Sequence, residues 1–292
     1  MKKRLLVCDL DNTLYDWVAY FVPSFYAMVD EVVKITGCDR EQLLDDFRTV
    51  HRTHHDSEHP FALLETQTIH KIFQGKSRNE MANILDPAFH AFNSTRKATL
   101  HLYPGVLVSL DTLSESGITL VAHTESNLFA ALDRLTRLEI EKYFKRIYCR
   151  ERSGGPHPNP DAAQVWFDRI SANKVKELSH HQRKPNPDVL LEICADESTE
   201  PSEAAYVGDS MARDILMARE ANVYAIWAKY GVSLVTDAYK KLVRVTHWTD
   251  DDVEREKKLA ARVERLRPDA VLEKSFGEIV EILLPSRLKN WA

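Results

Sequence analysis

A doubly wound α/β fold, built on a mostly parallel β-sheet, is the architecture that the sequence predicts. Five short apolar runs are rich in β-branched or aromatic residues and too short for typical helices, so we expect strands there. Helical periodicity lies between several of them, as in the spacing of Leu128, Leu132 and Leu135. Alternating strands and helices are typical of a parallel sheet covered on both faces. The runs are Leu5–Leu10, Ile118–Ala122, Arg146–Cys149, Ala204–Val207 and Val223–Trp227.

Residues 17–97 interrupt this alternation, because they contain helical patterns without a convincing strand. We expect them to form a helical insert, while residues 1–16 and 98–292 form the core. Pro23 is expected to kink or restart the first helix of this insert, because proline has no backbone donor. Tyr103-Pro104-Gly105 marks the return to the core.

Other segments of the core half also stand outside the alternation. An insertion at about residues 152–183 begins with a run rich in glycine and proline, and we expect a helix around Val165–Ile170. The charged segment Asp250–Arg267 predicts a solvated helix. Ser275-Phe276-Gly277-Glu278 has the pattern of a capping box, which predicts a helix after it.

Composition and charge exclude several classes of protein. The chain has 292 residues, of which 44% are hydrophobic and 28% charged, as in globular proteins. A formal net charge of −5 and the lack of a basic stripe argue against a nucleic-acid partner. No apolar stretch approaches the roughly 18 residues of a membrane span, and the apolar run after Met1-Lys2-Lys3-Arg4 is too short for a signal peptide.

The four cysteines show no metal-ligand spacing, and we expect them to be reduced packing residues. They are Cys8, Cys38, Cys149 and Cys194. With no targeting or membrane signal, a cytoplasmic location is expected, and the sequence leaves the oligomeric state open.

Two carboxylates end the first expected strand, in Asp9-Leu10-Asp11-Asn12-Thr13. Side chains alternate along a strand, so Asp9 and Asp11 lie on one side. Close carboxylates repel each other unless a cation lies between them, so the pattern indicates acid/base chemistry or a bound metal. The alternative interpretation is a turn with an Asx cap.

Three further segments bring polar residues to strand ends or near them. Asp209 and Asp214 follow the fourth strand, although a helix cap and a residue that complements the helix dipole would look the same. Thr124 and Glu125 follow the second strand at a helix start, which suits anion binding or capping alone. Lys184 could supply a cation, although a lysine before proline is commonly just solvated.

Taken in order, these segments resemble the four motifs of the haloacid dehalogenase superfamily of phosphatases. The resemblance covers roughly residues 4–16, 98–150 and 184–230. It implies a Rossmann-like core, and by its position the insert of residues 17–97 would be the small α-helical cap domain between motifs one and two. The matching motifs are Asp9-Leu10-Asp11-Asn12-Thr13, Thr124, Lys184, and Gly208-Asp209 through Asp214.

The resemblance implies a Mg²⁺-dependent phosphatase that hydrolyses a small-molecule phosphomonoester. Asp9 would be the nucleophile that forms an aspartyl-phosphate, and Asp11 would act as general acid and then as general base. The Mg²⁺ would be held by Asp9, Asp209, Asp214 and the backbone carbonyl of Asp11.

The same resemblance places the phosphate-binding positions at Thr124, Glu125 and Lys184. Glu125 departs from the pattern, because its negative charge would weaken phosphate binding unless the side chain points away. The long segment before Lys184 also leaves the approach of this lysine to the site open.

Other functions share the same motifs. A phosphotransferase such as a sugar-phosphate mutase has all four, and a noncatalytic binding or scaffold protein could retain the fold. A dehalogenase would not need Asp11. Substrate choice is expected to reside in the cap and at its entrance, around Tyr15, Asp16 and Trp17.

A dense polar cluster lies in the expected cap. It could bind a transition metal or contact substrate. Its spacing fits no single helical face, and a solvated loop near Pro60 is the favoured interpretation. The cluster consists of His51, His54, His55, Asp56 and His59.

Overall fold

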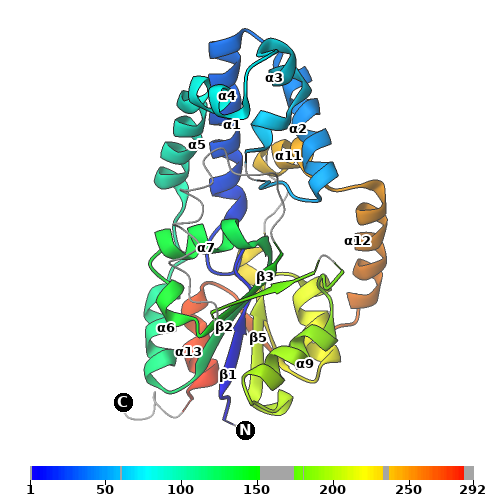
Figure 1. The fold of residues 1–292 in the computed structure, drawn as a ribbon. Helices are drawn as coiled ribbons and strands as arrows, with labels where there is room; N and C mark the ends of the chain where they lie inside the picture. The colour runs from blue at the N-terminus through cyan, green and yellow to red at the C-terminus, as the bar shows by residue number, and fades with distance from the viewer. Residues whose placement is uncertain (1, 60, 152–173, 180, 233–236, 286–292) are drawn as a thin grey trace.

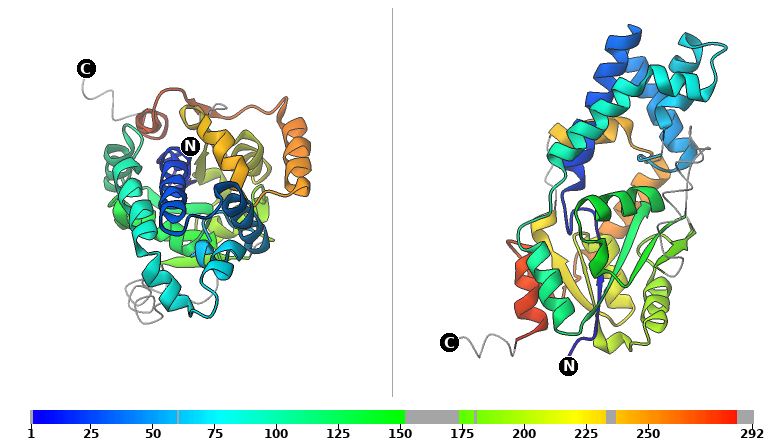
Figure 2. Two further views of the ribbon diagram at one scale, coloured as in Figure 1. Left: turned by 90° about the horizontal axis from the view of Figure 1, so that it is seen from above. Right: turned by 60° about the vertical axis from the view of Figure 1, so that its left-hand side comes forward.

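A seven-stranded sheet occupies one end of the molecule and a group of helices stands on the carboxyl ends of its strands (Figures 1 and 2). The computed structural model describes residues 2–59, 61–151, 174–179, 181–232 and 237–285. The expected helix at Val165–Ile170 lies outside the described residues. None of the described helices is long and apolar enough to cross a membrane.

All neighbouring strands pair in parallel, in the order β4-β3-β2-β1-β5-β6-β7, which confirms the predicted fold class. All five expected strands are present. The insertion contributes a sixth, β4, and the tail a seventh, β7, neither of which was expected. The strands are β1 (Leu5–Cys8), β2 (Thr119–Asn127), β3 (Arg146–Arg150), β4 (Val175–Leu178), β5 (Ala204–Gly208), β6 (Tyr224–Ala228) and β7 (Ala270–Leu272).

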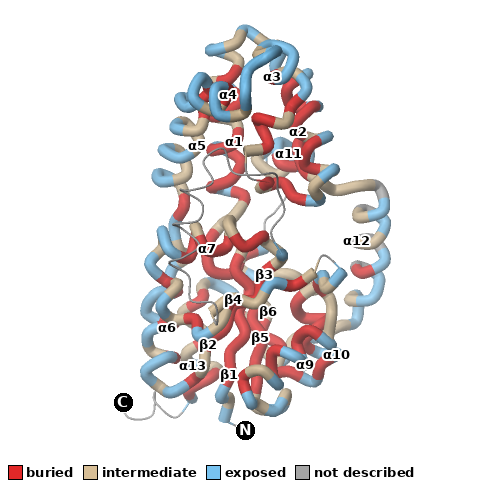
Figure 3. Tube along the Cα trace, viewed as in Figure 1, coloured by how far each residue is buried: buried red, intermediate tan, exposed pale blue. Residues whose placement is uncertain are grey.

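Helices cover both faces of the sheet. Leu5 and Val7 of β1 pack among side chains of α9 (Pro187–Asp196) and α10 (Leu216–Glu220). Leu6 and Cys8, which alternation turns the other way, belong to the cluster on the opposite face. That face is covered by α6 (Val106–Glu115), α7 (Leu128–Arg137) and α13 (Ile279–Leu283). The neighbouring strands β1 and β5 are therefore buried along their whole length (Figure 3).

The cap is helical, as predicted. Its first helix, α1, begins after Asp16, whose side chain accepts a hydrogen bond from the Ala19 N–H, and ends at Gly37 with a left-handed φ of 68°. The helix continues through Pro23, so the expected restart at this proline is wrong. The cap helices are α1 (Trp17–Thr36), α2 (Arg40–His54), α3 (Gln67–Ile72), α4 (Arg78–Ile84) and α5 (Asp86–Thr99).

One helix from the second half of the chain packs against the cap. After β6 the chain forms α11 (Asp237–Val245), which lies against α1 and α2 (Figure 1). Tyr26 Oη donates to the Lys241 carbonyl at 3.1 Å, and Arg244 pairs with Glu41 at 3.0 Å. The boundary between core and cap stays a prediction, but the cap helices are packed together with a segment far away in sequence.

Two expectations for the tail had different outcomes. The charged segment forms α12 (Asp250–Val263), as predicted. The capping box at Ser275 is wrong, because the Ser275 side chain makes no capping hydrogen bond. Glu278 instead accepts from the N–H groups of Glu273 and Lys274, at 2.8 and 3.0 Å. The four cysteines are free thiols, as expected, and three of them are buried.

The contact between α2 and α11 predicts a pH-dependent stability. His51 is 1% exposed and its Nδ1 lies 2.6 Å from the Val245 carbonyl oxygen. Burial lowers the pKa of His51 to about 4, although the hydrogen bond to Val245 opposes this. An unfolded histidine, with a pKa of about 6.5, takes up a proton that the folded one excludes, so the stability falls as the pH drops from 7 towards 4.

Because of His51, we expect the free energy of unfolding to fall by about 2 kcal/mol between pH 7 and pH 5. Urea unfolding at both pH values measures it. His51→Asn, which retains a donor near Val245 but does not titrate, should lose less on acidification, while the exposed-site variant His70→Asn should behave like the parent. An identical pH dependence in His51→Asn would contradict the assignment.

Candidate active site

The polar residues of the four motifs meet at the carboxyl edge of the central strands. Asp9 follows β1 directly and Asp209 follows β5, and these two strands are paired neighbours. Asp214 lies in the π-helical turn Met211–Ile215 that follows. Because parallel strands end at the same edge of a sheet, residues 200 positions apart in sequence come together here.

Three carboxylates of this edge form a cluster. Oxygens of Asp9, Asp209 and Asp214 all lie within 4.8 Å of one another. Lys184, although distant in sequence, reaches the cluster and donates through Nζ to Asp9 Oδ1 at 2.6 Å and to Asp214 Oδ1 at 2.9 Å. Lys184 is 3% exposed, so its ammonium group is held almost entirely by these acids.

Burial and mutual repulsion make the cluster electrostatically unbalanced. Burial raises the pKa of Asp9 to about 7, with Lys184 acting against this and Asp214 adding to it. Burial and the nearby Asp9 likewise raise the pKa of Asp209 well above its usual value. Three ionised carboxylates exceed the charge of one ammonium by two, which is the charge of a divalent cation. A set of carboxylate oxygens is also the donor set that Mg²⁺ prefers, so these residues fit that ion.

The backbone around the cluster allows close approach. Asp214 accepts hydrogen bonds from the Ser210 N–H at 3.0 Å and from Tyr206 Oη at 3.2 Å, which fix its carboxylate. A Cβ at Gly208 would lie 2.4 Å from that carboxylate, and a Cβ at Gly231 would lie 1.7 Å from the Asn12 carbonyl oxygen. Glycine is therefore required at both positions for the loops to meet.

Other residues of the first two motifs make local hydrogen bonds, one of which reaches Asp9. Thr13 Oγ1 donates to Asp9 Oδ2 at 3.1 Å. Asn12, in the turn between them, has a φ of 57° and accepts from the Trp17 N–H, which starts α1. Thr124 is buried, and its Oγ1 accepts from the Ser126 N–H at 3.1 Å.

Glu125 points toward the lysine segment. Its Oε1 accepts from the backbone N–H of Lys184 at 3.2 Å, and its Oε2 from Arg213 Nη1 at 3.0 Å. Although burial would raise the pKa of Glu125, Arg213 and Lys184 hold it below its usual value. The extra negative charge is thus neutralised, and it anchors the chain that carries Lys184.

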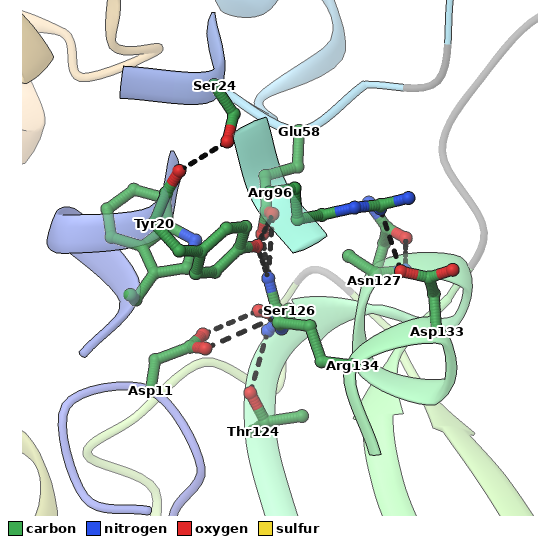
Figure 4. A network of polar contacts seen from close by, with 12 residues as sticks. Asp11, Tyr20, Ser24, Glu58, Arg96, Thr124, Ser126, Asn127, Asp133 and Arg134 are labelled. Atoms are coloured by element: carbon green, nitrogen blue, oxygen red, sulfur yellow. Dashed lines mark hydrogen bonds and ion pairs between the residues drawn. The ribbon is translucent and has the colours of Figure 1, made fainter. Parts of the chain in front are cut away.

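Asp11 faces a buried arginine that sequence reasoning missed (Figure 4). Arg134 of α7 is 1% exposed, and its Nη2 lies 3.3 Å from Asp11 Oδ1. Ser126 Oγ donates to Asp11 Oδ2 at 2.6 Å and accepts from Arg134 Nη2. Asp11 is therefore directed away from the three-carboxylate cluster and into a separate polar network.

The same arginine joins the core to the cap. Its Nη1 lies 2.7 Å from both oxygens of Glu58, in a cap loop, and 2.6 Å from Tyr20 Oη on α1 (Figure 4). Burial alone would lower the pKa of Arg134, but Asp11 and Glu58 raise it above its usual range. The arginine stays charged and links the two parts of the molecule at Asp11.

A cavity of about 480 Å³ lies beside this network and is lined mainly by apolar side chains. It shares Tyr20, Glu58 and Arg134 with the network, and seven of its lining residues are phenylalanines from the cap and α7. It therefore adjoins the side of the site where Asp11 lies.

The sequence did contain a signal for the burial of Arg134. This residue lies three positions after Ala131 and next to Leu135, so it falls on the edge of the buried stripe of α7.

Comparison with known proteins agrees with this geometry. A model of haloacid dehalogenase-like hydrolases matches residues 3–222. The chain belongs to the haloacid dehalogenase-like hydrolase family. It is 26% identical over 233 residues to a phosphoglycolate phosphatase of Agrobacterium fabrum, a match that covers 78% of this chain and 81% of the relative.

Other relatives match over a shorter region. A glyceraldehyde 3-phosphate phosphatase of Methanopyrus kandleri is 27% identical over 141 residues, which is 48% of this chain and 49% of the relative, so the match spans about half of each. Among solved structures, a 2-haloacid dehalogenase of Pseudomonas syringae covers 100% of both chains with a TM-score of 0.56 at 20% identity, a likeness of fold. The family's hydrolase fold is thus established for the chain.

The buried ion pair of Arg134 predicts a large effect on stability. Arg134→Gln should lower the free energy of unfolding by roughly 3–5 kcal/mol, because it leaves the Glu58 carboxylate, which is only 12% exposed, without its charged partner. Arg137→Gln is the matched control, since this arginine lies on the same helix but is 44% exposed in its pair with Asp133. It should cost at most about 0.5 kcal/mol.

A double-mutant cycle with Glu58→Gln, measured by urea unfolding, tests the pairing itself. The double variant should lose less stability than the sum of the two single variants, because each single change already breaks the pair. Additive losses would show that Arg134 and Glu58 do not interact energetically.

Proposed function

We propose that this hydrolase is a Mg²⁺-dependent phosphatase that releases phosphate from a small phosphomonoester through an aspartyl-phosphate at Asp9. The observation that carries the proposal is the assembly of Asp9, Asp209, Asp214 and Lys184 at one sheet edge. Asp11, two residues after Asp9, is held by its own contacts with Ser126 and Arg134. The phosphatase names of the sequence relatives give independent support.

The first step transfers the phosphoryl group to Asp9. A carboxylate oxygen of Asp9, oriented by Thr13 and Lys184, forms a bond to phosphorus while the bond to the leaving oxygen breaks. Asp11 gives its proton to that oxygen, so the alcohol leaves neutral. In this proposal the leaving group would lie on the side of the site where Asp11 contacts Ser126 and Arg134.

The second step regenerates the enzyme. Asp11, now a carboxylate, takes a proton from water as the water oxygen bonds to phosphorus and the bond from phosphorus to Asp9 breaks. Inorganic phosphate is released and Asp9 is restored. A single carboxyl group can serve both steps because the proton it loses in the first is replaced in the second.

The other residues balance charge. Asp9, Asp209 and Asp214, with the backbone carbonyl of Asp11, would hold the Mg²⁺, which reduces the repulsion between phosphate and carboxylates when bound. Lys184 and Thr124 would donate to the phosphoryl oxygens. Glu125, whose carboxylate already binds the Lys184 N–H and Arg213, would act by holding that lysine segment.

Asp9→Asn should abolish Mg²⁺-dependent phosphate release, because an amide is a poor nucleophile, and should leave the circular dichroism spectrum unchanged. The assay is phosphate release from a panel of phosphomonoesters with Mg²⁺ or with chelator. Because the adjoining cavity is lined by phenylalanines, the panel should include aromatic and aliphatic esters beside phosphoglycolate and glyceraldehyde 3-phosphate.

The controls separate the alternatives. Turnover by Asp9→Asn at the parental rate would remove Asp9 from the nucleophile role. Phosphate that reappears on an added sugar phosphate would identify a phosphotransferase, and silence across the panel together with undetectable Mg²⁺ binding would identify a noncatalytic protein.

A further inference from the structure

A second cluster of metal-ligating side chains lies in the cap. His54 ends α2, His59 lies in the loop that follows, and Glu65 ends the 3₁₀ helix η1 (Ala62–Glu65). One ligand atom from each residue lies within 4.8 Å of the others. The end of α2, the loop after it and the end of η1 therefore converge on one point.

The solvated-loop interpretation of the histidine-rich segment is wrong. His51, Asp56 and His59 are all buried. Asp56 accepts a hydrogen bond from Asn127 Nδ2 at 2.6 Å, and His51 contacts Val245, so neither is directed to the new cluster. Within the segment, His54 and His59 are the histidines that come together.

Both of these imidazoles face the same carboxylate. His54 Nε2 lies 2.7 Å from Glu65 Oε2, and His59 Nε2 lies 2.8 Å from Glu65 Oε1. The rings are stacked, with centroids 3.5 Å apart and planes inclined by 7°. Two nitrogens on neighbouring parallel rings and one carboxylate form a set of donors that needs only small side-chain shifts to surround one ion.

Burial makes the set rigid but reachable. The His59 side chain is fully buried, whereas those of His54 and Glu65 are about one quarter exposed, at 26% and 23%. An ion can therefore enter from the side of His54 and Glu65. Arg78 Nη2 lies 3.4 Å from Glu65 Oε1, which leaves Oε2 as the carboxylate oxygen for a metal.

We propose that His54, His59 and Glu65 bind Zn²⁺ in the cap, at a site separate from the carboxylates at the sheet edge. Two imidazole nitrogens and a carboxylate oxygen are the ligands that Zn²⁺ takes, whereas Mg²⁺ favours oxygen ligands. Three protein ligands leave a fourth position to water. The inference does not depend on the proposed phosphatase activity.

The site would fix the loop that reaches the core. Glu58 immediately precedes the ligand His59, and Glu58 pairs with Arg134, which in turn contacts Asp11. Zn²⁺ binding would therefore hold the cap end of this chain of contacts in place.

The experiment is a calorimetric titration of the full-length, untagged, chelator-treated chain with Zn²⁺ in a large excess of Mg²⁺. We expect one high-affinity Zn²⁺ equivalent in the parent. His54→Gln should weaken it by more than about a hundredfold, beyond the 10–100-fold typical of a lost outer contact. His55→Gln is the matched control, because His55 is the exposed neighbour outside the cluster and should bind like the parent.

Thermal unfolding provides the second measurement. Zn²⁺ should raise the Tm of the parent and of His55→Gln but not that of His54→Gln, because a ligand stabilises the folded state that binds it. No Zn²⁺ binding in excess Mg²⁺, or equal binding by His54→Gln and the parent, would overturn the proposal and identify the cluster as a carboxylate hydrogen-bonded by two histidines.

Discussion

The ammonium group of Lys184, buried between Asp9 and Asp214, is the interaction on which the arrangement of this site depends. A parallel sheet brings its strand ends to one edge, and in this chain those ends carry acids that lie within contact of each other. Burying these carboxylates without a positive charge beside them would be strongly unfavourable. The loop before α9 supplies that charge, and Glu125 and Arg213 fix the loop.

Arg134 supplies the positive charge beside Asp11, as Lys184 does beside Asp9, and it also contacts the cap. It is buried among Asp11, Glu58 and Tyr20, so its charge is shared between a motif residue and the cap. Lys184 pairs with the carboxylate cluster and Arg134 with Asp11, so the two aspartates of the first motif have distinct surroundings. The environments differ although the residues are two positions apart.

The sequence predicted the parallel sheet and the helical cap because both depend on local patterns of apolar residues. It also predicted that Asp9, Asp209 and Asp214 lie near each other, since strand ends in a parallel sheet must meet. Asp11, expected on the same side as Asp9, contacts Ser126 and Arg134 instead, because the chain has left β1 before it reaches this residue. Arg134 and Glu58 were missed because their pairing joins α7 to a cap loop, and no local pattern specifies that contact. The capping box at Ser275 failed for a related reason, since Glu278 found backbone N–H groups at Glu273 and Lys274 instead. The strands β4 and β7 are short, and their pairing with a neighbouring strand decides their conformation.

The position of α11 has a consequence for how this cap could be exchanged. Helix α11 follows β6 in the chain but packs on α1 and α2, with Val245 against His51 and Lys241 against Tyr26. A cap excised at residues 17–97 and grafted onto another hydrolase would lose that covering and expose the apolar surface beneath it. In this protein the cap helices are thus packed with a segment that does not lie between β1 and β2. Any recombination that preserves the cap must carry the segment after β6 as well, so the two halves of the chain are expected to be inherited together.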